Sequence, residues 1–162
     1  MSLLSLFKKR SQHSLSKGPS PPHTYAQWSV WFEEFSCGGK DDDLLLLALD
    51  GHINWSHGLA VQFTQRAVRT LELRLEATRK MLQAALQKGR TEHDVTRAIL
   101  NARQAFCLLA RYASLPCWPA PLPQTLTDMI TQTTMALQKS LLEGAEKDRT
   151  GRIAKALRDN PL

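Results

Sequence analysis

Residues 57–88 read HGLAVQFTQRAVRTLELRLEATRKMLQAALQK, and this stretch determines the fold class. Apolar side chains recur in it every seven residues, a spacing typical of a long helix that buries one side. The repeating residues are Val61, Val68, Leu75 and Leu82, with Leu71 and Leu86 beside them. Ser56 is a suitable N-cap and Gly89 a suitable end, so we expect one helix over about 56–88. A helix of about 30 residues is roughly 45 Å long, which favours a helical bundle.

The next stretch, residues 91–113, predicts a second helix that is apolar on more than one side. Thr91 is a suitable N-cap, and the main apolar stripe recurs at spacings of three and four residues. The stripe consists of Val95, Ile99, Ala102, Phe106, Leu109 and Ala113. Leu100 and Leu108 fall outside it, which predicts a second interface. Arg103 lies only about 60° from the centre of the stripe, so we expect it beside a carboxylate or at a functional contact.

An aromatic-rich helix is expected to begin at Thr24, which has capping-box spacing to Gln27. Five aromatic side chains follow on one helical face, and rings of this size are usually buried. They are Tyr25, Trp28, Trp31, Phe32 and Phe35. The helix should end at residues 37–40, and Asp41–Asp43 are expected to cap the apolar run Leu44–Leu49.

Two further helices are expected towards the C-terminus. Residues 115–123 contain four prolines and predict a stiff connector, which Cys117 and Trp118 should attach to the core. A third long helix is expected over about 124–142, and a short last helix over about 153–157.

These elements predict an all-α chain: a helical bundle of three long helices, with an aromatic-rich N-terminal helix and a short C-terminal helix. Residues 1–23 are rich in Ser, Pro and Lys, which predicts a flexible basic tail. Residues 24–162 are expected to form a single helical-bundle domain, since a chain of 162 residues is long enough for one core.

Charge is unevenly placed along this chain, whose formal net charge is +6. Residues 59–114 hold ten basic and four acidic residues, whereas residues 24–58 hold one basic and six acidic residues. A basic excess favours acidic partners, namely nucleic acid, anionic lipid or an acidic protein surface. The longest apolar run, Leu44–Leu49, is far shorter than the roughly 20 residues of a membrane span, which excludes a transmembrane protein.

The three cysteines, Cys37, Cys107 and Cys117, fit no disulfide framework, so we expect a reducing, cytoplasmic compartment. Cys107 lies in an apolar helical run and is expected to be a small buried side chain. The basic residues of the N-terminus follow its short apolar stretch, the reverse of a secretory signal, so we expect no cleavable signal.

The most site-like stretch is residues 50–58, where His52 and His57 flank Asn54 and Trp55. The spacing of the two histidines does not place them on one helical face, and no second ligand pair of zinc spacing follows. Asp41–Asp43 lack the glycine-punctuated loop of a calcium site, and no phosphate-binding glycine loop occurs in the sequence. We therefore expect a non-enzymatic protein with no metal and no cofactor.

The first functional hypothesis is a small interaction or assembly protein that packs helices on a protein partner or, as a homo-oligomer, on a second copy of itself. Apolar side chains left over from the bundle would make the contacts, and arginines would steer an acidic partner. The predicted partner-binding residues are Trp28, Trp31, Leu100, Arg103 and Leu108.

Two alternative hypotheses stay open from the sequence. Nucleic-acid binding would use arginines of the two central helices, namely Arg66, Arg69, Arg90, Arg97 and Arg111. Peripheral attachment to an anionic membrane surface would use the apolar and basic N-terminus, namely Leu3, Leu4, Phe7, Lys8, Lys9 and Arg10.

The nucleic-acid hypothesis predicts a salt-dependent complex. If the arginines bind phosphates, the full chain should shift nucleic acid in a mobility assay at low salt. The complex should weaken steeply as salt rises, because phosphate binding releases condensed counterions. Absence of a complex at low salt would contradict this hypothesis.

Overall fold

The computed structural model describes residues 21–42, 44, 47 and 57–162, with only the backbone at 57 and 58. These residues are helical or lie in turns and contain no strand, which confirms the predicted all-α fold class. The helices are α1 (Tyr25–Ser36), α3 (His57–Leu86), α4 (Glu92–Ala113), α5 (Leu122–Lys147) and α6 (Arg152–Asp159). No described helix is both long enough and apolar enough to cross a membrane.

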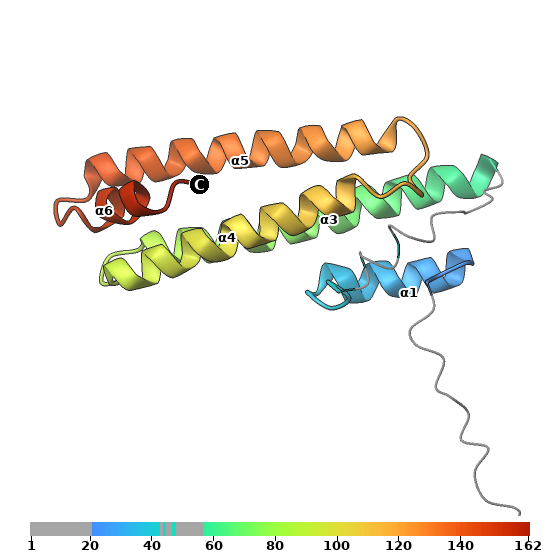
Figure 1. Ribbon diagram of the computed structural model, residues 1–162, viewed down its shortest axis with the longest axis horizontal. Helices are drawn as coiled ribbons and strands as arrows, with labels where there is room; N and C mark the ends of the chain where they lie inside the picture. Colours follow the sequence, from blue (N-terminus) through green and yellow to red (C-terminus); the bar gives the residue numbers. More distant parts are fainter. Residues whose placement is uncertain (1–20, 43, 45–46, 48–56) are drawn as a thin grey trace, which may run out of the picture.

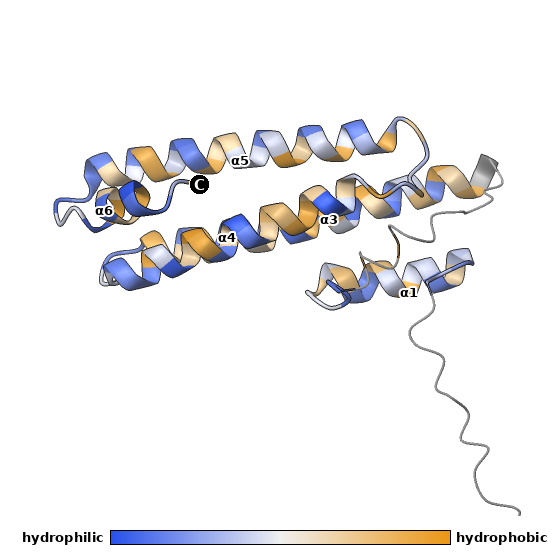
Figure 2. Cartoon of the chain, viewed as in Figure 1, coloured by the Kyte–Doolittle hydropathy of each residue, from blue (hydrophilic) through white to orange (hydrophobic). Residues whose placement is uncertain are grey.

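The three long helices, α3, α4 and α5, run alternately in opposite directions along the long axis of the molecule (Figure 1). α4 contacts α3, α5 and α6, and α3 contacts α1, α4 and α5. α1 packs against α3, and α6 packs against α4 and α5 at the opposite end. Hydrophobic and hydrophilic residues alternate along each long helix (Figure 2), as expected of helices that bury one side.

Two helices start with the capping bonds that the sequence predicts. The Gln27 N–H donates to Thr24 Oγ1 (3.3 Å), and the Gln27 side chain accepts from the Thr24 N–H (3.1 Å). At α4, the Asp94 N–H donates to Thr91 Oγ1 (3.2 Å), and the Asp94 carboxylate accepts from the Thr91 N–H (2.9 Å). These reciprocal bonds satisfy N–H groups that a helix start leaves free.

α3 has nearly its predicted length, but its buried side differs at one position. The predicted residues that are buried or half-buried are Val68, Leu71, Leu75, Leu82 and Leu86. Val61 is 51% exposed, which corrects the prediction that it belongs to the buried side. Phe63 is fully buried instead, and at about 100° per residue the two side chains leave the helix about 160° apart. The predicted N-cap, Ser56, lies outside the described residues.

The main stripe of α4 is buried throughout, as predicted. It consists of Val95, Ile99, Ala102, Phe106, Leu109 and Ala113. Cys107 is exposed, so the prediction that it is a buried side chain is wrong. Because Cys107 follows Phe106 by one residue, its side chain turns about 100° away from the stripe and towards solvent.

α5 is longer than predicted at both ends. It begins at Leu122, with Pro123 in its first turn, where a helix needs no backbone donor. It ends at Lys147 and runs through Gly144, whereas the sequence predicted an end near Leu142. A Cβ at Gly144 would lie 3.6 Å from Ile153 Cδ1, an ordinary van der Waals distance, so α6 packs against α5 at this point without requiring a glycine.

A cluster of buried aromatic rings joins α1 to α3, α4 and the connector before α5. Its members are Trp28, Trp31, Phe32, Phe35, Phe63, Tyr112 and Trp118. The Tyr112 hydroxyl donates to the Ala67 carbonyl (2.8 Å), and the Trp118 indole donates to the Tyr112 carbonyl. Cys117 is buried beside Trp118, so both residues attach the connector to the core as predicted.

Arg74 of α3 holds the C-terminal end of α1. Its Nη1 donates to the Phe35 carbonyl (2.9 Å) and to Asp41 Oδ1 (3.0 Å), and its Nη2 donates to Asp41 Oδ2 (3.2 Å). The guanidinium carbon also lies 4.7 Å from the centre of the Phe35 ring. The Arg74 side chain is 12% exposed and that of Asp41 is 40% exposed, so the guanidinium group is largely shielded from water and the carboxylate is only partly shielded.

Replacing Arg74 should loosen α1 from α3. In Arg74→Lys, a single ammonium group cannot donate to the Phe35 carbonyl and to both Asp41 oxygens. The free energy of unfolding should therefore fall by about 1–3 kcal/mol. Arg79→Lys is the matched control, because the side chains of the Arg79–Glu76 pair are 43% and 40% exposed. The control should change by less than about 1 kcal/mol. Urea unfolding measures both variants, and equal losses would contradict the role of Arg74.

Candidate functional site

The second apolar side predicted for α4 lies at the surface of the molecule. Leu100, Arg103 and Leu108 line one hollow of about 390 Å³. The other described lining residues are Gln104, Cys107 and Arg111, all from α4. Three of the five predicted partner-binding residues are therefore brought together here, and we call this surface the α4 hollow.

The two leucines of the α4 hollow are covered to different extents. Leu100 is 40% exposed, whereas Leu108 is half-buried and packs against the core. At about 100° per residue, Leu100 leaves the helix about 140° from Val95 in the buried stripe. Leu108 leaves the helix at a similar angle on the other side and reaches the core, whereas Leu100 stays at the surface.

Two arginines place positive charge in the same hollow. Arg103 and Arg111 are exposed, and no carboxylate of the described residues pairs with either of them. The sequence predicted a carboxylate partner or a functional contact for Arg103, and the described part of the chain provides no such carboxylate. A guanidinium group without such a pair can bind an external carboxylate through its forked donors.

A second hollow, of about 520 Å³, adjoins the α4 hollow and shares Leu108 and Arg111 with it. Asp41 and Asp42 line the second hollow, together with apolar residues of the neighbouring turns. Asp41 is already paired with Arg74. The surface thus changes from acidic near the end of α1 to apolar and basic along α4.

Trp28 and Trp31 do not belong to this surface. Their side chains are 1% and 4% exposed, which corrects the prediction that they offer a face to a partner. Neither buried indole N–H group has an acceptor among the described residues, and a buried donor left without one costs roughly 1–3 kcal/mol. Burying 150–250 Å² of each ring contributes about 4–6 kcal/mol, so the rings stay in the core despite that cost.

The arginines of the nucleic-acid hypothesis are distributed over separate parts of the surface. Arg69 is paired with Glu72 (2.9 Å), and Arg66 is exposed on the same helix. Arg90 and Arg97 line a hollow of about 210 Å³ between α3 and α4, whereas Arg111 lines the α4 hollow.

Other candidates from the sequence fall outside the described residues. These are the membrane-contact residues, Leu3–Arg10, the histidine stretch 50–56 and the side chain of His57. Within the described part of the chain, no three His, Cys, Asp or Glu side chains are grouped so that they could hold a metal ion.

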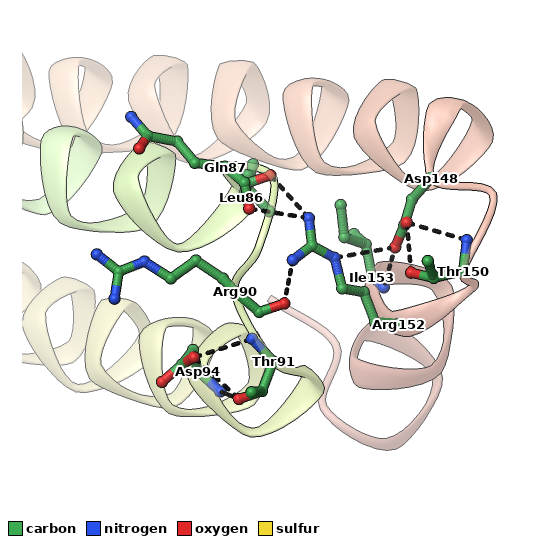
Figure 3. A network of polar contacts seen from close by, with 9 residues as sticks. All are labelled: Leu86, Gln87, Arg90, Thr91, Asp94, Asp148, Thr150, Arg152 and Ile153. Atoms are coloured by element: carbon green, nitrogen blue, oxygen red, sulfur yellow. Dashed lines mark hydrogen bonds and ion pairs between the residues drawn. The ribbon is translucent and has the colours of Figure 1, made fainter.

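A polar network that the sequence analysis missed joins two turns at one end of the molecule (Figure 3). Arg152 of α6 donates to the carbonyls of Leu86 (3.1 Å), Gln87 (3.0 Å) and Arg90. Its Nε lies 3.4 Å from Asp148 Oδ2. A cation thus satisfies carbonyls that the end of α3 leaves free. The i,i+4 spacing of Asp148 and Arg152 is the one local signal that could have drawn attention to the network.

Asp148 is the anionic centre of this network. Its carboxylate accepts from the Thr150 hydroxyl (2.6 Å), the Thr150 N–H (3.2 Å) and the Ile153 N–H (3.1 Å). The bond from the Thr150 hydroxyl is the main cause that lowers the pKa of Asp148 from 3.8 to about 2. Folding therefore favours the ionised form of this carboxyl group.

No protein-family model, curated protein or solved structure matches this chain.

The lowered pKa of Asp148 predicts a loss of stability in acid. Because its folded pKa of about 2 lies below the ordinary 3.8, its contribution is present at neutral pH and is lost as pH falls towards 2. Asp148→Asn should lower the melting temperature at neutral pH, and its melting temperature should then fall less than that of the wild type between about pH 5 and pH 2. Asp128→Asn, on the exposed side of α5, is the control. If the melting temperatures of the wild type and Asp148→Asn fall equally between about pH 5 and pH 2, the ionised Asp148 does not stabilise the fold and the prediction is wrong.

Proposed function

We propose that the protein is a non-enzymatic interaction protein that binds an acidic amphipathic helix of a partner protein in the α4 hollow. In this proposal α3, α4 and α5 form a helical bundle that serves as the scaffold, with α1 and α6 attached to it. The apolar side of the partner helix lies over Leu100 and Leu108, and its acidic side chains pair with Arg103 and Arg111.

The exposure of Leu100 beside two unpaired arginines carries this proposal. An exposed leucine alone is ordinary at a protein surface. Here the exposed leucine lies in a hollow with Arg103 and Arg111, neither of which has a carboxylate partner among the described residues. A helix that supplies both apolar and acidic side chains would cover the leucine and neutralise both cations.

The spacing of the lining residues favours a helical partner. Leu100, Arg103, Cys107 and Arg111 follow one another at intervals of three and four residues, so the hollow runs along one side of α4. From Leu100 to Arg111 this side is about 16 Å long, or roughly three helical turns. A partner helix of similar length could match it, and opposite charges would speed the encounter.

The described lining of the α4 hollow favours binding over catalysis. It contains neither a histidine nor a carboxylate that could transfer a proton. Its two charged residues are arginines, whose guanidinium groups donate hydrogen bonds and can orient an anion.

The cysteines support the cytoplasmic setting included in the proposal. Cys37, Cys107 and Cys117 form no disulfide, and the thiols of Cys37 and Cys107 are exposed. Exposed thiols stay reduced in compartments that maintain reducing conditions.

Selection from a library of helical peptides on the immobilised full chain tests the proposal. The enriched peptides should carry apolar residues at helical spacing with acidic residues beside them. Their affinity should fall at least about tenfold for Leu100→Glu and for Arg103→Glu, since each change places an acidic side chain against an acidic ligand. Leu73→Glu on α3 is the matched control, because Leu73 is 41% exposed and Leu100 is 40% exposed.

Enrichment of peptides without acidic residues would contradict the proposal, as would equal binding to Leu100→Glu and Leu73→Glu. Sedimentation of the same variants tests the alternative that a second copy of this chain occupies the α4 hollow. If the wild-type chain forms a dimer that Leu100→Glu alone dissociates, the α4 hollow belongs to a second copy of this chain and not to a separate partner.

A further inference from the structure

A separate hollow of about 750 Å³ lies where the turn between α3 and α4 meets the turn between α5 and α6. Leu86, Gly144 and Ile153 are the apolar residues of its lining, and charged residues from both turns surround them. We call it the end hollow. It shares no described residue with the α4 hollow, so the inference drawn from it does not depend on the proposed function.

The carboxylates beside the end hollow are already neutralised. Asp148 is paired with Arg152 (3.4 Å) and accepts the hydrogen bonds described above. Glu92 is paired with Lys155, whose Nζ lies 3.0 Å from Glu92 Oε2. Arg152 is itself occupied by Asp148 and by three backbone carbonyls (Figure 3). None of these groups is left to balance another charge.

Four further cations line the end hollow without an acidic partner among the described residues. They are Lys88, Arg90, Lys147 and Arg149, and all four are exposed. The Arg90 side chain extends away from Arg152 in Figure 3, so we assign only the other three cations to the site. Three unneutralised cations around one hollow create a local positive potential that attracts anions.

We propose that the end hollow binds a compact ligand that carries two or more phosphate groups. Arg149 offers the forked donor that matches phosphate oxygens, and Lys88 and Lys147 add two point charges. An anion with a single charge would neutralise only one of these three cations, so a ligand with several phosphate charges fits the site better. The network around Arg152 and Asp148 fixes both turns in place, which reduces the ordering that binding requires.

A soluble polyphosphate and the headgroup of a phosphoinositide share this chemistry, and two arms of one experiment distinguish them. Titration calorimetry of the full chain at low salt uses inorganic pyrophosphate and inorganic phosphate. Flotation compares phosphatidylcholine vesicles containing phosphatidylinositol bisphosphate with vesicles of equal charge containing phosphatidylserine. The test variant is Lys147→Gln/Arg149→Gln, which changes exposed side chains only.

The matched control is Arg66→Gln/Lys139→Gln, which removes the same charge from exposed positions that do not line the end hollow. We expect saturable one-to-one binding of pyrophosphate that is tighter than binding of phosphate, or flotation that prefers the bisphosphate vesicles. Either signal should weaken at least about tenfold in the test variant, since each lost charge-assisted contact is worth about that factor. The control should bind as the wild type does.

Two outcomes would overturn the proposal. The first is the absence of both saturable pyrophosphate binding and preferential flotation for the wild type at low salt. The second is equal weakening in the test variant and the control, which would assign the binding to the overall positive charge of the chain rather than to this hollow. A signal confined to one arm supports the site and identifies the source of its ligand.

Discussion

The burial of one stripe of α4 between α3, α5 and α6 is the constraint on which the other features depend. The stripe from Val95 to Ala113 is buried along its whole length, α4 contacts α3, α5 and α6, and its Tyr112 ring packs on Phe35 of α1. Helices can exclude water only from the sides on which they pack. Leu100 lies about 140° around the helix from Val95 and is 40% exposed, so this apolar side of α4 is not fully covered by the packing that stabilises the core.

Some arginines of the basic excess make contacts that stabilise the fold, whereas others have no partner among the described residues. Arg74 and Arg152 each donate to carbonyls near the C-terminal end of a helix other than their own, where a cation is favoured by the free carbonyls and the helix dipole. Arg69 and Arg79 pair with acids one turn away on α3. Arg103, Arg111 and Arg149 have no such partner among the described residues, and each lies in a hollow. Positive charge that does not stabilise the fold is thus placed at two separate surfaces.

The helices and their starts could be predicted from the sequence because their causes are local. The caps at Thr24 and Thr91 depend on residues three positions away, and the stripe of α4 depends on spacings of three and four. Two expectations about burial were wrong. Val61 fits the seven-residue repeat but is exposed, since such a repeat drifts by about 20° per heptad around an ideal helix, and Cys107 lies in an apolar run but leaves the helix on its solvent side.

The polar contacts that join different helices and turns could not be predicted from the sequence. Arg74 and Asp41 are 33 residues apart, and Arg152 and Leu86 are 66 residues apart. No periodic pattern relates side chains at such distances, because their meeting depends on how whole helices pack. The α4 hollow was partly predictable, because Leu100, Leu108 and Arg103 depart from the apolar pattern of their helix. The end hollow was not, because it is built from two turns that only the fold brings together.

Thiol labelling of the full chain, followed by mass spectrometry, tests the open side of α4 most directly. Cys107 lines the α4 hollow and Cys37 is exposed elsewhere, whereas burial raises the pKa of the Cys117 thiol to about 12. The account predicts that a maleimide labels Cys107 and Cys37 rapidly and Cys117 slowly, and that an acidic amphipathic helical peptide protects Cys107 alone. Labelling of Cys107 as slow as that of Cys117 in the chain by itself would show that this side of α4 is already covered, and would contradict the account.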